Sequence, residues 1–348
     1  MADQRGVGYK GYIPLRYIIS IIMAVIEIIA IIAILVILTI YIPYFYIAIY
    51  LTVVSIILYI IASYENPDYK IPWIVTVIVF PIVGMMLYFI FSKRKLPNKI
   101  INKLKIIDKP LFCEETSLNM ITLSSDNDLI CSQAMNLCTL SKSNLYRNNE
   151  LKYYPLGEKM YEDIIFELKK AKRFIFLEYF IIEEGIFWNN ILEILKEKAS
   201  EGVEIKLLYD DIGCMATLPG NYYKKLRKHN ISAFPFSKLR GTADGEFNNR
   251  SHRKILVIDG LVGFTGGINI ADEYINETVK FGHWKDTGLK IKGNSVNELT
   301  RLFLIDYYLN NKKVKNTEFE KYYRYQETIV TENYIIPFGD GPKPIYEK

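Results

Sequence analysis

The stretch SHRKILVIDG, Ser251–Gly260, carries three groups able to do chemistry around a short apolar run. His252 is followed two residues later by Lys254 and then by Asp259. An imidazole can attack phosphorus and form a covalent intermediate, an ammonium can neutralise non-bridging oxygens, and a carboxylate can hold the imidazole in its reactive tautomer. The set therefore predicts phosphodiester exchange that needs no metal and no cofactor.

The apolar run between these groups predicts a buried strand. ILVI is too short and too β-branched for a helix, and Gly260 ends it. Because side chains alternate along a strand, His252 and Lys254 are expected on the same face. Asp259 falls on the opposite parity at the far end, so we expect it to miss the histidine of its own strand and to be available to a neighbouring copy.

The elements around this strand predict an α/β domain that begins near Tyr154. Apolar residues at helical spacing precede a strand over Phe174–Ile182 that is rich in aromatic and β-branched side chains. Further segments alternate in the same way: a helix around Trp188–Leu195, a strand at Val203–Asp210, a short helix at Tyr222–His229 and a strand at Ile231–Phe236. This alternation predicts a sheet covered on both faces. The sequence SVNE, Ser295–Glu298, predicts a capping box that opens the last helix.

Three nearly uncharged apolar runs precede this domain, at Tyr17–Thr39, Tyr44–Ser63 and Trp73–Phe91. Each has about 19 residues or more, enough to cross roughly 30 Å of hydrocarbon as a helix. A cleaved signal peptide is the alternative for the first run, but that run is too long and no small-residue cleavage site follows it. Residues 1–92 are therefore expected to form a membrane anchor of two or three helices.

The topology that the basic residues predict conflicts with the number of apolar runs. Basic residues lie on both sides of the anchor, which places both of its ends in the cytoplasm and requires an even number of crossings. Three runs do not satisfy this requirement. The uncharged link around Tyr41–Pro43 leaves open that one run is interfacial or re-entrant. We expect a multi-pass protein whose catalytic domain is cytoplasmic.

A connector over residues 93–153 follows the anchor. Its segment KLPNKIINKLKIIDK, Lys95–Lys109, predicts either a basic amphipathic helix on the membrane surface or a solvated linker. The charges of the first 92 residues cancel, so the whole formal excess of +5 lies in the remainder, which suits anionic headgroups. The four cysteines show neither metal-binding spacing nor a disulfide framework, and we expect reduced thiols.

His252, Lys254 and Asp259 match the HxKxxxxD motif of the phospholipase D superfamily. The segments around them resemble bacterial cardiolipin synthase from about Tyr44 to Gly341: GFTGGINIADEYIN, GHWKDTG, LEYFII, LYDDIG, NPDYKIPWI and FPIVGMMLYFIF. The resemblance implies N-terminal transmembrane helices followed by an α/β phospholipase D-like domain, with one repeat and a mixed sheet flanked by helices. It places the protein in a bacterial cell membrane.

The resemblance also implies roles for individual residues. His252 would be the nucleophile on phosphorus, Lys254 a phosphate ligand and Asp259 the orienting acid. The remaining implied substrate- or phosphate-binding residues are the family's GGxN element, Gly266, Gly267 and Asn269, and two carboxylates near the site, Glu178 and Asp286. For the two carboxylates, a purely structural role in the protein interior is an equal alternative. The implied reaction moves a phosphatidyl group from one phosphatidylglycerol to another, forming cardiolipin and glycerol.

One departure from the family pattern matters for function. The family carries two HxKxxxxD motifs whose histidines meet, one attacking and one protonating the leaving oxygen, whereas this sequence contains one. The final stretch, ENYIIPFGDGPKPIYEK, resembles the opening strand of the second repeat. We therefore expect an anchor, a catalytic half over residues 154–335, and the start of a truncated second repeat over residues 336–348.

Three interpretations follow from the single motif. In the first, a homodimer or a separate chain supplies the second motif and the enzyme acts on phosphatidylglycerol in the membrane. In the second, the chain is an inactive membrane-bound fragment. In the third, it is a homodimeric nuclease-type phosphodiesterase. The apolar runs and the mild positive charge argue against a nucleic-acid partner.

Overall fold

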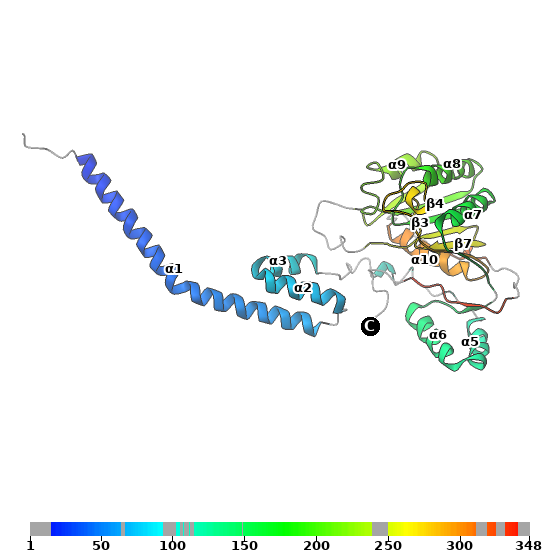
Figure 1. The fold of residues 1–348 in the computed structure, drawn as a ribbon, viewed down its shortest axis with the longest axis horizontal. Helices are drawn as coiled ribbons and strands as arrows, with labels where there is room; N and C mark the ends of the chain where they lie inside the picture. Colours follow the sequence, from blue (N-terminus) through cyan, green and yellow to red (C-terminus); the bar gives the residue numbers. More distant parts are fainter. Residues whose placement is uncertain are drawn as a thin grey trace, which may run out of the picture. The chain divides into compact units, whose positions relative to one another are not determined.

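The computed structural model describes residues 15–63, 67–92, 102–104, 107, 111, 115–147, 149–238, 250–310, 319–324 and 331–339 (Figure 1). The chain divides into two compact units, Met1–Ser92 and Lys93–Lys348.

The first two apolar runs form one continuous helix, α1 (Leu15–Ala62), of 48 residues. Pro43 lies inside it, where proline removes one hydrogen-bond donor and favours a bend without ending the helix. Figure 1 shows a bend along α1. Of the described residues, those from Ile18 to Ala62 form the one helix long and apolar enough to cross a membrane. The expectation of two separate helices here is wrong, because the uncharged link around Pro43 continues the helix.

The third apolar run is divided into two short helices, α2 (Pro67–Val79) and α3 (Pro81–Phe91). With 13 and 11 residues they extend about 20 Å and 17 Å, less than the roughly 30 Å of hydrocarbon. They pack closely, because a Cβ on Gly84 would lie 2.4 Å from the carbonyl oxygen of Thr76. The run that was expected to be one membrane-length helix is therefore a pair of packed helices broken before Pro81.

The second unit is built on a seven-stranded mixed sheet with the order β2-β8-β7-β6-β3-β4-β5. The pairs β3–β4 and β4–β5 are parallel, and the other pairs are antiparallel. The strands are β2 (Glu150–Tyr154), β3 (Phe174–Tyr179), β4 (Glu204–Asp210), β5 (Ile231–Phe236), β6 (Ile255–Ile258), β7 (Val262–Gly266) and β8 (Gly288–Lys292). The sequence predicted N-terminal transmembrane helices followed by an α/β domain with a mixed sheet flanked by helices. This fold class is confirmed, with a long apolar N-terminal helix in the first unit.

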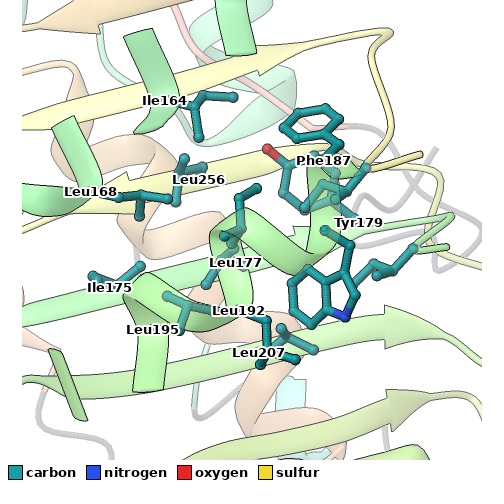
Figure 2. Packing of buried hydrophobic residues seen from close by; sticks show 14 of the residues in the cluster. Ile164, Leu168, Ile175, Leu177, Tyr179, Phe187, Leu192, Leu195, Leu207 and Leu256 are labelled. Atoms are coloured by element: carbon teal, nitrogen blue, oxygen red, sulfur yellow. The ribbon is translucent and has the colours of Figure 1, made fainter. Parts of the chain in front are cut away.

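Helices cover both faces of this sheet. On one face, α7 (Gly157–Lys169) and α8 (Ile186–Ser200) bury their apolar sides against β3 and β6, as Figure 2 shows for Ile164, Leu195 and Leu256. On the other face, α10 (Val296–Asn310) packs Phe303 on Phe176 with ring centroids 4.8 Å apart. Short helices complete the unit: α9 (Tyr222–Arg227), η2 (Asp272–Ile275) and η3 (Glu320–Tyr322).

The connector is more structured than expected. It contains two helices, α5 (Glu115–Asp126) and α6 (Asp128–Ser141), and its last residues enter the main sheet as β2. Leu104 and Ile107, expected in a membrane-surface helix or a solvated linker, are buried in the core on the α10 side of the sheet. Most of Lys95–Lys109 lies outside the described residues.

The stretch expected to open a second repeat contains β9 (Tyr334–Ile335). It pairs antiparallel with β1 (Tyr146–Arg147), apart from the main sheet, and residues 340–348 lie outside the described part of the chain.

The start of α10 agrees with the prediction, but the capping box is wrong. Ser295 Oγ donates to Oδ1 of Asn149 at 2.7 Å. The carboxylate of Glu298 pairs with Arg301 and accepts from the hydroxyl of Tyr146 at 3.2 Å. Both side chains find tertiary partners in place of the local backbone bonds.

Candidate active site

His252 lies three residues before β6, where three strand ends meet. Ile255 of β6 pairs with Thr265 of β7, and Gly266 pairs with Gly288 at the start of β8. The segment before β6, the end of β7 and the start of β8 therefore share one edge of the sheet. This edge gathers residues that are far apart in the sequence.

The side chains of His252 and Lys254 meet, as strand alternation predicts. The Nζ atom of Lys254 lies 3.1 Å from Nε2 and 3.2 Å from Nδ1 of His252, and donates to the His252 carbonyl at 2.8 Å. The ring of Phe180 lies 4.8 Å from the imidazole, centroid to centroid, and forms an apolar wall. One phosphate group can therefore contact both the imidazole and the ammonium.

The surroundings favour the neutral, nucleophilic imidazole. Burial and the neighbouring charge of Lys254 lower the pKa of His252, while Asp210 and Asp286 oppose that shift. Burial lowers the pKa of Lys254 to about 8, again against the effect of Asp286. An ammonium that is costly to bury gains from a phosphate anion, because opposite charge restores the stability of its charged form.

Two glycines, Gly266 and Gly267, leave space beside the site for the segment that carries Asp286. A Cβ on Gly267 would lie 2.0 Å from Oδ1 of Asp286, so a larger residue would displace the carboxylate. Gly266 has φ +149, and its Cβ would lie 2.4 Å from the carbonyl oxygen of Thr287. At these two glycines the backbone therefore lies close to the segment that carries Asp286.

Asn269 uses its amide within the protein. It is 2% exposed, its Oδ1 accepts from the Ile181 backbone at 3.0 Å, and its Nδ2 donates to the hydroxyl of Tyr274 at 2.7 Å. These bonds tie the end of β3 to η2. In this structure Asn269 holds the wall of the site, whereas the resemblance implies that it positions phosphate.

Asp259 lies at the opposite end of β6 from His252. Its carboxylate accepts from three consecutive backbone amides, those of Lys172, Arg173 and Phe174, at 2.8, 2.7 and 2.9 Å. It thus fixes the start of β3, in agreement with the strand parity. The carboxylates whose charge reaches His252 are Asp210 and Asp286.

Glu178 lies on the other face of the sheet from Lys254, among residues that flank His252. It is 1% exposed, and the hydroxyl of Ser251 donates to its Oε1 at 2.5 Å. Its Oε2 is buried with no hydrogen-bond donor among the described residues. Burial and the nearby Asp306 raise the pKa of Glu178, and Asp306 in turn pairs with Arg253 at 2.9 Å. Glu178 therefore contacts Ser251, the residue before His252, and does not line the face that bears Lys254.

Four residues near His252 were not predicted from the sequence: Asp210, Ser251, Arg253 and Asp306. Asp210 ends β4, is 1% exposed, and accepts from the backbone amides of Ile212 at 2.9 Å and Ser251 at 3.3 Å. The signal that points to it is a carboxylate at the carboxyl end of a buried strand. Arg253 and Asp306 carried no local signal, because α10 meets the segment before β6 only in the folded chain.

The family models match both units. Residues 164–296 match the model described as cardiolipin synthase, PLD-like domain, and residues 47–93 match the phospholipase D-nuclease N-terminal model. The first match includes His252, Lys254 and Asp286, so the residues assembled at the sheet edge lie inside the recognised domain.

Curated relatives give the same assignment. The chain is 44% identical over 199 residues to an uncharacterized protein of Streptococcus mutans, over 57% of this chain and 42% of that protein. It is 42% identical over 166 residues to cardiolipin synthase 2 of Staphylococcus epidermidis, and 38% identical over 174 residues to a cardiolipin synthase of Staphylococcus aureus. Each of these two alignments covers 47% of this chain and 33% of the relative, so the chain spans less than half the length of the relatives it matches. Residues 164–296, which include His252, Lys254 and Asp286, are therefore similar to the PLD-like domain of bacterial cardiolipin synthases.

Proposed function

We propose that this chain is a phosphatidyltransferase of the cardiolipin synthase type that acts on phosphatidylglycerol through a phosphohistidine at His252. The contact of Lys254 with both ring nitrogens of His252, at 3.1 and 3.2 Å, carries the proposal. It creates one place where a nucleophile and a cation meet the same phosphate.

The first step forms a bond from an imidazole nitrogen of His252 to phosphorus and breaks the bond from phosphorus to the glycerol headgroup. The departing oxygen takes a proton and leaves as glycerol. Lys254 neutralises the non-bridging oxygens as charge develops on them. Asp286 stabilises the positive charge that the imidazole acquires, in keeping with its effect on the His252 pKa.

The second step reverses the roles. A hydroxyl of a second phosphatidylglycerol loses its proton and attacks the phosphohistidine, and the bond from nitrogen to phosphorus breaks. The product is cardiolipin, and His252 is regenerated. No metal and no cofactor takes part in either step.

The leaving oxygen needs an acid, and the sequence has one HxKxxxxD motif. We propose that another polypeptide segment supplies the second histidine, either a second copy of this chain in an isologous contact or a separate chain. The single motif also supports an alternative, in which the chain binds lipid in the membrane without turnover.

The proposed setting is the bacterial cell membrane. The apolar helix α1 and the cardiolipin synthase relatives support membrane association. Basic residues on both sides of the apolar segment favour a cytoplasmic catalytic unit and a multi-pass anchor.

The direct test supplies labelled phosphatidylglycerol to the full chain reconstituted in vesicles, with a metal chelator present. We expect cardiolipin and free glycerol in equal amounts, and loss of both in His252→Ala. His229→Ala replaces an exposed histidine just after α9; it is the matched control and should retain activity. Release of glycerol without cardiolipin would indicate a hydrolase, and absence of both would favour the inactive alternative.

A further inference from the structure

The segment that leads to Asp286 presents two apolar side chains to the outside. Val279 and Phe281 are 83% and 81% exposed, more than any other large apolar side chain in the described part of the chain. We call residues 277–285 the apolar loop. Exposing a Phe and a Val to water gives up burial energy that folding normally gains, so this arrangement suits an apolar partner.

The base of the apolar loop is fixed by polar contacts. Oδ1 of Asn276 accepts from the Trp284 amide at 2.7 Å, and Nδ2 donates to the Trp284 carbonyl at 3.0 Å. Between the two apolar residues, Lys280 pairs with Glu273 at 3.0 Å and lies 3.6 Å from Glu183. These contacts fix the ends and the middle of the apolar loop, while the side chains of Val279 and Phe281 remain exposed.

This loop borders the candidate active site. It leads directly into Asp286, whose carboxylate packs on Gly267 and affects the pKa of His252. Trp284 packs on Tyr274 with centroids 4.8 Å apart, and the hydroxyl of Tyr274 bonds Asn269 in the wall of the site. A lipid whose phosphate reaches His252 has its acyl chains only a glycerol backbone away from that phosphate, which favours apolar groups on the border of the site.

The composition of the loop fits a membrane surface. Phe281 and Trp284 are aromatic, and Lys285 is an exposed cation beside them. Aromatic rings at the boundary between headgroups and hydrocarbon, with cations at the level of the phosphates, are typical of interfacial segments.

We propose that the apolar loop inserts Val279 and Phe281 among the acyl chains of an anionic bilayer and so brings the phosphate of a membrane-embedded lipid to His252. The choice of lipid rests on the proposed function. The contact itself is independent of turnover and is tested separately.

The first test locates the loop. In a full-length parent whose four cysteines are replaced by alanine, Phe281→Cys carries an environment-sensitive fluorophore, and Leu261→Cys, in the turn between β6 and β7 at the far end of the sheet, is the control. The chain is reconstituted in vesicles of phosphatidylglycerol and phosphatidylcholine. We expect quenching at position 281 by acyl-chain nitroxides and protection there from iodide, with the reverse at position 261. Iodide quenching at both positions would overturn the proposal, and so would protection of position 281 from both quenchers, which would mean a protein partner covers it.

The second test separates the loop from the chemistry. The double variant Val279→Ser, Phe281→Ser should lose roughly tenfold in turnover of phosphatidylglycerol in vesicles and little on a short-chain, water-dispersed analogue, because burial of the two side chains no longer aids the contact. Leu261→Ser should change neither rate. Equal loss on both substrates, or no loss on vesicles, would contradict the proposal. If the wild type shows no turnover, the proposed function fails while the fluorescence result still decides the loop contact.

Discussion

The Nζ atom of Lys254 lies 3.1 Å from Nε2 of His252 and also bonds the carbonyl oxygen of that histidine at 2.8 Å. Lys254 thus acts on His252 in two ways: its charge lowers the pKa of the imidazole, and its ammonium donates a hydrogen bond to the backbone of that residue. Both effects can be measured.

Lys254→Met should raise the pKa of His252, because the charge of Lys254 is one of the causes that lower it, after burial. The acid limb of the pH–rate profile should move to higher pH by the same amount. Turnover should also fall by roughly a hundredfold or more, because the charge on the non-bridging oxygens is no longer neutralised. A nuclear magnetic resonance titration of His252 measures the shift, with Lys224→Met on α9 as the matched control. A His252 pKa that stays the same or falls would show that the lysine charge does not act on the imidazole.

Glu178→Gln should remove the part of the pH dependence of stability that arises from ionisation of Glu178. The pKa of Glu178 is raised from 4.5 by burial and by Asp306, so its contribution to stability is complete below pH 4.5 and is lost as the pH rises through the raised value. Glutamine keeps an acceptor for Ser251 and stays neutral. The difference in melting temperature between variant and wild type should therefore grow in favour of the variant as the pH rises above 4.5. A constant difference from pH 4.5 into the alkaline range would contradict a protonated Glu178.

Asp259→Ala should destabilise the fold and leave the chemistry of folded molecules nearly unchanged. Three backbone amides at the start of β3 lose their acceptor, and unsatisfied buried donors cost about 1–3 kcal/mol each when water does not replace the bond. Chemical denaturation of the variant measures the loss, and kcat is compared at a temperature where it remains folded. A stable variant with greatly reduced kcat would instead support the role that the family resemblance implies for Asp259, that of the orienting acid.

Mixing His252→Ala with wild type tests the shared site. If two copies each supply one histidine, a mixture of equal parts should retain about a quarter of the wild-type activity, because only pairs of wild-type chains are complete. Activity should also rise more steeply than linearly with protein density in the vesicle. Half the activity in the mixture, with a linear density dependence, would show that each chain acts without a second copy.

The local sequence pattern was sufficient to predict much of the α/β unit. The alternation expected for the segment that leads into β6 correctly placed the side chains of His252 and Lys254 together, and Asp259 at the far end of β6, because this parity is a property of the local sequence. For Glu178 the sequence left phosphate binding and a structural role open, because the face on which it lies depends on the register between β3 and β6, in which it pairs with Ile255. Register between strands distant in sequence is not encoded in either strand alone.

Prediction of the helices in the N-terminal unit was limited in a similar way. Hydropathy identified the apolar segments, but it could not show that α1 continues through Pro43 while the next segment breaks before Pro81. The break is accompanied by close packing of Gly84 on Thr76, a contact between α3 and α2. Similarly, the roles of Asn149 and Arg301 at the start of α10 depend on partners that only the fold brings near.

The proposed mechanism requires that His252 carry the phosphatidyl group between donor and acceptor. The most direct measurement is acid quenching of the reconstituted chain during its first turnover with phosphatidylglycerol labelled in the phosphatidyl moiety, followed by mass spectrometry of the peptides. We expect a label on His252 that forms in the presence of a chelator, is absent in His252→Ala and disappears as cardiolipin forms. Cardiolipin formation with no label on His252, or with the label on another residue, would rule out the proposed phosphohistidine.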